Sequence, residues 1–159
     1  MKQIKLLILI TFYLTNCKTK PPAEVLKDYE VESINKTGTE GTVTFKVWCY
    51  GKSSDEAILK AKYSAVHAVL FRGIPGSNFE SPMIADSKIQ DKKKDYFDNF
   101  FATNGKYINF VTLSNDGSIG VGDRLKVGKQ YKVATIVQVN HVQLRKEMEN
   151  NGIIRKFGY

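Results

Sequence analysis

Apolar and polar side chains alternate along residues 41–50. The apolar positions are Val43, Phe45, Val47 and Cys49, and the intervening ones are Thr44, Lys46, Trp48 and Tyr50. Because successive side chains of a β-strand point to opposite faces, this period of two predicts a strand with one buried face. A weaker pattern at Tyr29 and Val31 predicts a short edge strand that reaches Ser33 or Ile34.

The next segment changes to a helical period. Four alanines recur at spacings of four, four and three residues, namely Ala57, Ala61, Ala65 and Ala68. This spacing predicts a helix with an inward stripe of small side chains, which lets a helix lie close against a sheet. Ser53 and Glu56 have the spacing of a capping box at its start. Gly73 and Pro75 are expected to end it after Phe71.

The middle of the chain combines a long loop with an aromatic cluster. We expect a loop over 77–92, long enough to cover part of a site. A short amphipathic helix should follow and end at Asn104-Gly105, and its rings are those of Tyr96, Phe97, Phe100 and Phe101. Two interpretations stay open: the rings pack into the core, or they form a surface that binds a partner or ligand.

The last third of the chain predicts two strands and a helix. The strands are expected over 107–113 and 131–140, joined by a turn at 114–117 and a glycine-rich connection at 118–129, and the helix over 142–151. The order of elements predicts a single α+β domain over 41–159. Its sheet should have three to four mostly antiparallel strands, packed against the alanine-striped helix and the C-terminal helix.

The chain begins with an apolar run that is too short to span a bilayer. Leu6–Leu14 contains nine residues, whereas a spanning helix needs about 20. Lys2 and Lys5 precede the run. A short positive region followed by such a run is typical of a secretory signal.

The segment Leu14-Thr15-Asn16-Cys17 follows this run and resembles the lipobox of bacterial lipoproteins. The resemblance implies that residues 1–16 are a signal peptide that is removed. It also implies that the Cys17 thiol carries a diacylglycerol, so that residues 17–40 form the lipidated N-terminus and tether. No acidic residue comes directly after Cys17, which under the Gram-negative sorting rule favours the outer membrane. We expect its periplasmic side rather than the cell surface. The alternatives are an ordinary signal peptide, or an uncleaved anchor with an incidental cysteine.

Export affects how the second cysteine and the net charge are interpreted. If Cys17 is a thioether, Cys49 has no partner in the chain, and its apolar setting predicts an inert buried thiol.

Loss of Lys2 and Lys5 with the signal lowers the formal charge from +8 to +6. This balance favours anionic surfaces such as lipid headgroups or cell-wall polymer. An exported, lipid-tethered protein rarely meets nucleic acid, so we expect no nucleic-acid partner.

Catalytic and metal-binding motifs are scarce. Residues 117–122 (GSIGVG) lack the strand-to-helix setting of a dinucleotide-binding loop, and Gly128-Lys129 is not followed by the Ser or Thr of a Walker motif. His67 and His141 lie on separate expected helices and in no metal-binding spacing. We therefore expect no cofactor, no metal and no catalytic residue.

Two segments are similar in pattern to small Gram-negative envelope lipoproteins, namely VWCYGKSSDEAILKAKYSAVHAVLF and YKVATIVQVNHVQLRKEMENNGI. The resemblance implies an α+β domain that binds or scaffolds other envelope proteins, as in flagellar or cell-wall assembly. We therefore expect a non-enzymatic outer-membrane lipoprotein that serves as an accessory or scaffold in secretion or wall-building machinery. The alternative is a periplasmic cell-wall- or ligand-binding module, or a small hydrolase, that uses loop 77–92 and the aromatic cluster. Candidate partner-binding residues are Tyr96, Phe97, Phe100, Phe101 and the basic run Lys92, Lys93 and Lys94, which could instead be a solvated segment.

Overall fold

Two long antiparallel strands form the centre of the sheet in the computed structural model, which describes residues 28–34, 40–114 and 119–156. They are β2 (Thr42–Gly51) and β5 (Gln130–Asn140). Their register runs from Thr42 opposite Asn140 to Gly51 opposite Tyr131. The buried positions of β2 are those of the apolar set, so the alternation did identify the inner face. The leader over 1–16 and Cys17 lie outside the described residues.

Three shorter strands complete an open, fully antiparallel sheet of five strands. They are β1 (Tyr29–Ser33), β3 (Val111–Leu113) and β4 (Arg124–Val127). β1 pairs with β2, while β3 and β4 pair with opposite ends of β5. The predicted α+β class is confirmed. Because β1 belongs to the sheet, the folded part of the chain starts before residue 41.

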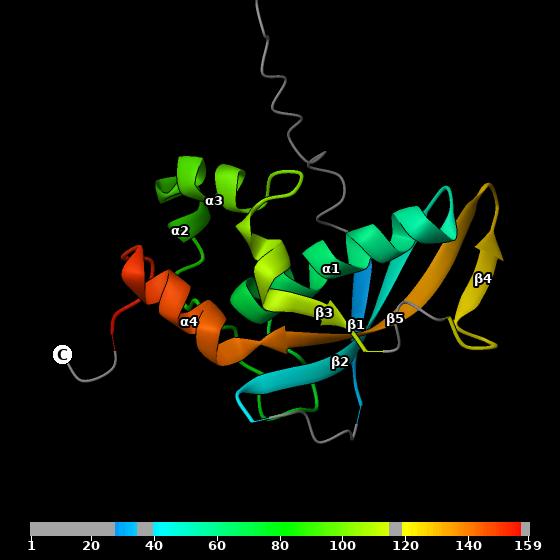
Figure 1. Ribbon diagram of the computed structural model, residues 1–159, viewed down its shortest axis with the longest axis horizontal. Coiled ribbons are helices and arrows are strands. Elements are labelled where there is room, and N and C mark those ends of the chain that lie inside the picture. Colours follow the sequence, from blue (N-terminus) through cyan, green and yellow to red (C-terminus); the bar gives the residue numbers. More distant parts are fainter. Residues whose placement is uncertain (1–27, 35–39, 115–118, 157–159) are drawn as a thin grey trace, which may run out of the picture.

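The alanine-striped helix α1 (Ser54–Phe71) covers the inner face of the sheet (Figure 1). The Ser53 hydroxyl accepts a hydrogen bond from the Glu56 backbone N–H at 3.2 Å, as the capping box predicted. All four alanines of the stripe are fully buried. Their small side chains bring the helix close enough for Phe45 and Val47 of β2 to be completely enclosed.

Two predictions for the later part of the chain were wrong in detail. Residues 106–110 form a 3₁₀ helix, η2 (Lys106–Phe110), so the strand expected from residue 107 begins only at Val111. The rings of Tyr107 and Phe110 are three residues apart, and a 3₁₀ turn directs both to one side, where they contact Phe101 and Phe100. The connection expected over 118–129 contains β4. Each residue of β4 is exposed, so its sequence has no alternation of buried and exposed positions that would predict a strand.

Three further helices surround this core. They are α2 (Ile89–Lys92), α3 (Lys94–Phe100) and α4 (His141–Asn150). α4 leaves one end of β5, and the β4 hairpin lies at the other end (Figure 1). The Asn140 side chain caps α4 by accepting from the Gln143 N–H at 2.9 Å, while Leu144 and Met148 are buried. Within the described part of the chain, no helix combines the length and apolar character that a membrane span requires.

Candidate functional site

The basic run chosen from the sequence lies around one shallow depression. Its volume is about 290 Å³, and its lining consists of Asp91, Lys92, Lys93, Lys94, Asp95 and Tyr96. Two of the lysines already have carboxylate partners: Lys92 Nζ is 2.9 Å from Asp86 and Lys94 Nζ is 2.7 Å from Asp98. The bond from Lys92 lowers the pKa of the Asp86 carboxyl. The depression is therefore a surface of balanced charge rather than a strongly cationic one.

The three phenylalanines of the aromatic cluster lie in the core. Phe97, Phe100 and Phe101 are 6%, 2% and 4% exposed, and each contacts other buried rings. Only Tyr96 is half-buried, stacked on Phe100 with a centroid distance of 5.8 Å. The structure thus separates the predicted set: lysines and Tyr96 lie at the surface, and the phenylalanines support them from below. A partner at this depression would contact the lysines and Tyr96 without reaching the phenylalanine rings.

The loop expected over 77–92 returns to the C-terminal end of α1. The backbone N–H groups of Met83 and Ile84 donate to the carbonyls of Val69 and Leu70, both at 3.0 Å. These carbonyls belong to the last turn of the helix, where no N–H group of the helix itself is available to donate to them. The last four residues of the range, which we predicted as loop, form α2. The loop therefore caps a helix, and its last part borders the depression.

Buried polar groups connect β1 and β2 to α1. The Tyr29 hydroxyl is 2.8 Å from His67 Nδ1, and the Cys49 thiol donates to the Ser64 hydroxyl at 3.5 Å. Burial lowers the pKa of His67 to about 4, with the Arg72 charge contributing in the same direction. Burial raises the pKa of the Cys49 thiol to about 11. At neutral pH the imidazole is uncharged and the thiol protonated, which are the forms that suit a packed interior.

A second surface, which the sequence reasoning missed, is the outer face of the sheet. We call it the Trp48 face, and its central residues are Glu30, Glu32, Lys46, Trp48, Tyr50 and Lys132. It lies opposite the face that α1 covers, and the alternate positions of β2 there are only half-buried. The sequence did contain one signal for this surface: Trp48 stands among polar residues on the outward side of the alternating segment 41–50.

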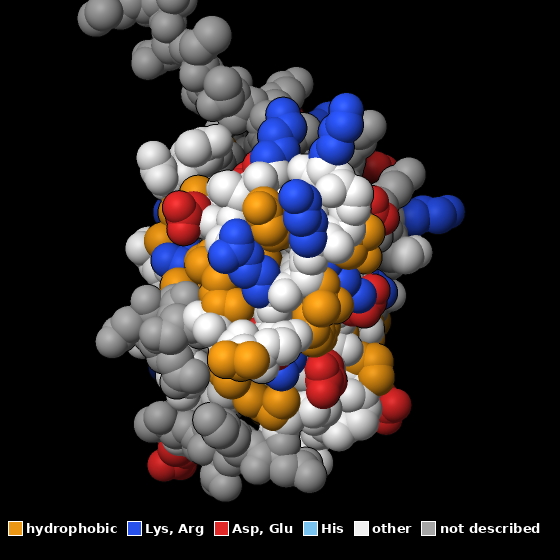
Figure 2. Space-filling model, turned by 90° about the vertical axis from the view of Figure 1, so that its right-hand side faces the viewer, with side chains coloured by type: hydrophobic (Ala, Val, Ile, Leu, Met, Phe, Trp, Pro, Cys, Tyr) orange, Lys and Arg blue, Asp and Glu red, His pale blue; other side chains and the backbone are white. Residues whose placement is uncertain are grey.

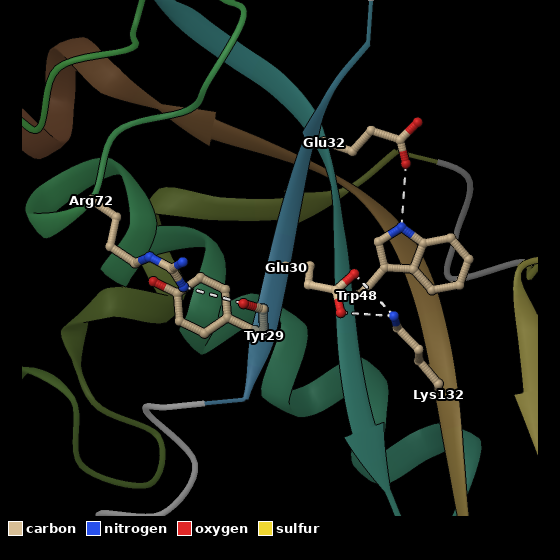
Figure 3. Close-up of polar contacts among 6 residues, drawn as sticks. All are labelled: Tyr29, Glu30, Glu32, Trp48, Arg72 and Lys132. Carbon is tan, nitrogen blue, oxygen red and sulfur yellow. Dashed lines mark hydrogen bonds and ion pairs between the residues drawn. The ribbon is translucent and has the colours of Figure 1, made fainter. Parts of the chain in front are cut away.

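One ion pair and one hydrogen bond link side chains of the Trp48 face across neighbouring strands (Figure 3). Lys132 Nζ lies 2.8 and 2.9 Å from the two carboxylate oxygens of Glu30, and Trp48 Nε1 donates to Glu32 at 3.3 Å. The ammonium groups of Lys132 and Lys46 lie 5.3 and 5.8 Å from the Trp48 ring centre. Such distances allow cation–π attraction. The half-buried indole therefore lies near two cations and is hydrogen-bonded to one carboxylate.

No family model, curated protein or solved structure matches this chain.

The chemistry available to these surfaces is that of recognition. Among the described residues, no group of three or more His, Cys, Asp or Glu side chains is placed to hold a metal ion. The Trp48 face offers ring stacking, two cations and two carboxylates within one sheet surface. The depression offers ammonium groups and the ring of Tyr96.

Proposed function

We propose that this chain is an outer-membrane lipoprotein that binds other envelope proteins as a non-enzymatic accessory or scaffold. Anchoring rests on the lipobox-like Leu14–Cys17 segment after the apolar run. The binding role rests chiefly on one structural observation, the Trp48 face that α1 does not cover, with its half-buried, hydrogen-bonded indole. The sheet uses its inner face for the core and leaves the outer face available to a partner.

The composition of the Trp48 face favours a protein partner. Tryptophan is enriched among the residues that contribute most to protein interfaces. Both signs of charge occur side by side, because Glu30 and Glu32 of β1 lie next to Trp48 and Lys46 of β2. A mixed pattern of this kind complements another mixed surface and sets its orientation. A ligand of a single charge would meet repulsion from part of the face.

Photo-crosslinking in cells tests this proposal. A photoreactive side chain at Tyr50 of the Trp48 face should form a discrete crosslink to an envelope protein, and Trp48→Ala should remove that crosslink. The same group at Lys93 serves as the matched control on the other surface. If the crosslink at Tyr50 were absent, or unaffected by Trp48→Ala, the binding role of this face would be wrong.

Anchoring is tested separately by Cys17→Ala. The unsubstituted chain should fractionate with membranes and carry the mass of attached lipid. The variant should lose both properties. If the variant stayed membrane-bound and its mass differed from that of the parent only by the substitution, the lipoprotein assignment would fail without affecting the crosslinking result.

A second function is supported by the depression bounded by Asp91 and Tyr96. Its lysines could bind an anionic cell-wall fragment, which would make the chain a periplasmic cell-wall- or ligand-binding module or a small hydrolase. Binding of such a polymer that is lost in Lys93→Glu but kept in Trp48→Ala would favour this alternative.

A further inference from the structure

The hairpin formed by β4 and the start of β5 mixes exposed apolar side chains with cations. Leu125 and Val127 are each 48% exposed, and Val121 just before the strand is fully exposed. The turn at Gly128-Lys129 has two residues with glycine first, as in type II′ hairpins. A Cβ built on Gly128 meets nothing within 4 Å, so the hairpin tip projects from the domain.

The charge of this hairpin is strongly positive and largely uncompensated. Residues 123–132 contain four cations and one carboxylate. Asp123 is paired with Lys46, and Lys132 with Glu30. The three remaining cations, Arg124, Lys126 and Lys129, form no ion pair within the part of the chain that the structure describes. The depression differs, because two of its lysines have carboxylate partners.

The surface that contains this end of the molecule shows the same mixture. In Figure 2, lysine and arginine side chains are interspersed with hydrophobic ones in the upper and central part of the face, and acidic side chains lie at its sides and in its lower part. Lysines on an edge strand also discourage pairing with another strand. That role explains Lys126, but it gives no reason for Leu125 and Val127 to be exposed beside it.

The sheet register aligns the base of the hairpin with the start of β1. Tyr29, the first residue of β1, is opposite Cys49; Cys49 is opposite Val133; and Val133 is opposite Arg124. These four residues form one row across the sheet. With neighbouring strands about 4.8 Å apart, Tyr29 and Arg124 are separated by roughly 14 Å. A chain from Cys17 to residue 28 spans at most about 40 Å, so an anchor at Cys17 would leave the hairpin within reach of the bilayer.

We propose that the β4–β5 hairpin docks onto a membrane surface that contains anionic phospholipid. This inference rests on the proposed lipid anchor, and it adds a second contact that fixes the orientation of the domain. Leu125 and Val127 enter the headgroup region, while Arg124, Lys126 and Lys129 bind the lipid phosphates. Apolar insertion combined with electrostatic attraction is how peripheral segments bind anionic membranes. One Lys or Arg near such a surface strengthens binding about fivefold.

Amine footprinting of the full chain tests the docking. The chain is expressed with its leader and reconstituted into vesicles of phosphatidylglycerol or of phosphatidylcholine, and an acylating reagent labels its lysines. With phosphatidylglycerol, we expect labelling of Lys126 and Lys129 to slow about fivefold, whereas Lys88 and Lys93 keep their rates. High salt should restore the labelling of the hairpin. The intact mass shows independently whether Cys17 carries lipid.

Variants distinguish lipid from other anionic ligands. Leu125→Ser with Val127→Ser keeps every lysine and should restore most of the labelling at Lys126 and Lys129. If this double variant stayed as protected as the parent, and a soluble anionic polymer gave the same protection, the hairpin would bind polyanions and the lipid proposal would be overturned. Equal slowing at Lys88 and Lys93, or no slowing at the hairpin of a chain that carries lipid, would overturn it as well.

Discussion

The hydroxyl oxygen of Tyr29 lies 2.8 Å from Nδ1 of His67 and ties the first strand to the middle of α1. The imidazole also stacks against Tyr63 and contacts Phe71, so apolar rings surround it. A neutral imidazole has one N–H donor and one acceptor nitrogen, and these face the Tyr29 hydroxyl at Nδ1 and the Gln90 amide nitrogen, 3.5 Å from Nε2. Protonation of His67 leaves the ring with no acceptor and places a charge among the neighbouring rings.

We predict that the protein loses stability as the pH falls from about 6.5 to 4. Burial lowers the pKa of His67 to about 4 in the folded state, against an ordinary value of 6.5. The folded state therefore binds fewer protons than the unfolded state in this window, so its stability is complete above pH 6.5 and decreases below it. The full loss amounts to about 3 kcal/mol. Urea unfolding across this pH range measures it.

His67→Gln serves as the control for that titration. The glutamine side chain carries no charge at any of these pH values, so the slope of stability against pH should become flatter by the amount that His67 contributes. If the variant and the parent kept the same slope, the pH dependence would come from other groups. Burial is the larger cause of the lowered pKa of His67 and the Arg72 charge the smaller one, so Tyr29→Phe should keep most of this pH dependence.

The core elements were predictable because local signals agreed with their burial. The capping box marks the start of α1, while the alanine stripe and the alternation in 41–50 each identify the buried face of one element. β4 gave no such signal, since both of its faces are exposed and only the register with β5 defines it. The Trp48 face needed that same pairing information, because Glu30 and Lys132 come from strands far apart in the sequence.

We predict that the two halves of the candidate partner-binding set differ sharply in their effect on stability. Phe100 is 2% exposed, so Phe100→Ala should lower the free energy of unfolding by about 3–5 kcal/mol. Lys93 is exposed and has no ion pair among the described side chains, so Lys93→Ala should change it by less than about 0.5 kcal/mol. Chemical denaturation of both variants checks this contrast. A small effect at Phe100 would mean that the aromatic cluster is not core.

We predict that the thiol of Cys49 is unreactive in the folded protein. It is 2% exposed, and burial raises its pKa to about 11, so almost no thiolate is present at pH 8. A disulfide reagent should titrate it only at the rate of unfolding. The number of thiols that react rapidly in the folded chain then reports on Cys17. That number should be zero if Cys17 is a thioether and one if Cys17 is a free, accessible thiol. Rapid reaction in Cys49→Ser would locate a free thiol at Cys17.

The last prediction concerns the glycine that ends α1. Gly73 has φ +76°, and an added Cβ would collide with the backbone carbonyl of Glu80 in the returning loop. Gly73→Ala should therefore lower the free energy of unfolding by at least about 3 kcal/mol. Gly128 also has a positive φ, of +60°, but its Cβ would meet nothing, so Gly128→Ala should show only the backbone strain of about 1–2 kcal/mol.

Asparagine at both positions separates the two causes of that loss. Asparagine adopts positive φ more readily than alanine, so Gly128→Asn should cost no more than Gly128→Ala in thermal unfolding. Gly73→Asn keeps the collision with Glu80 and should remain strongly destabilised. Because the loop that begins there caps the carbonyls of Val69 and Leu70, this variant should also speed amide exchange of Met83 and Ile84. Equal stability of the two asparagine variants would mean that backbone conformation alone selects glycine at 73, and that the close packing of the loop on α1 contributes nothing.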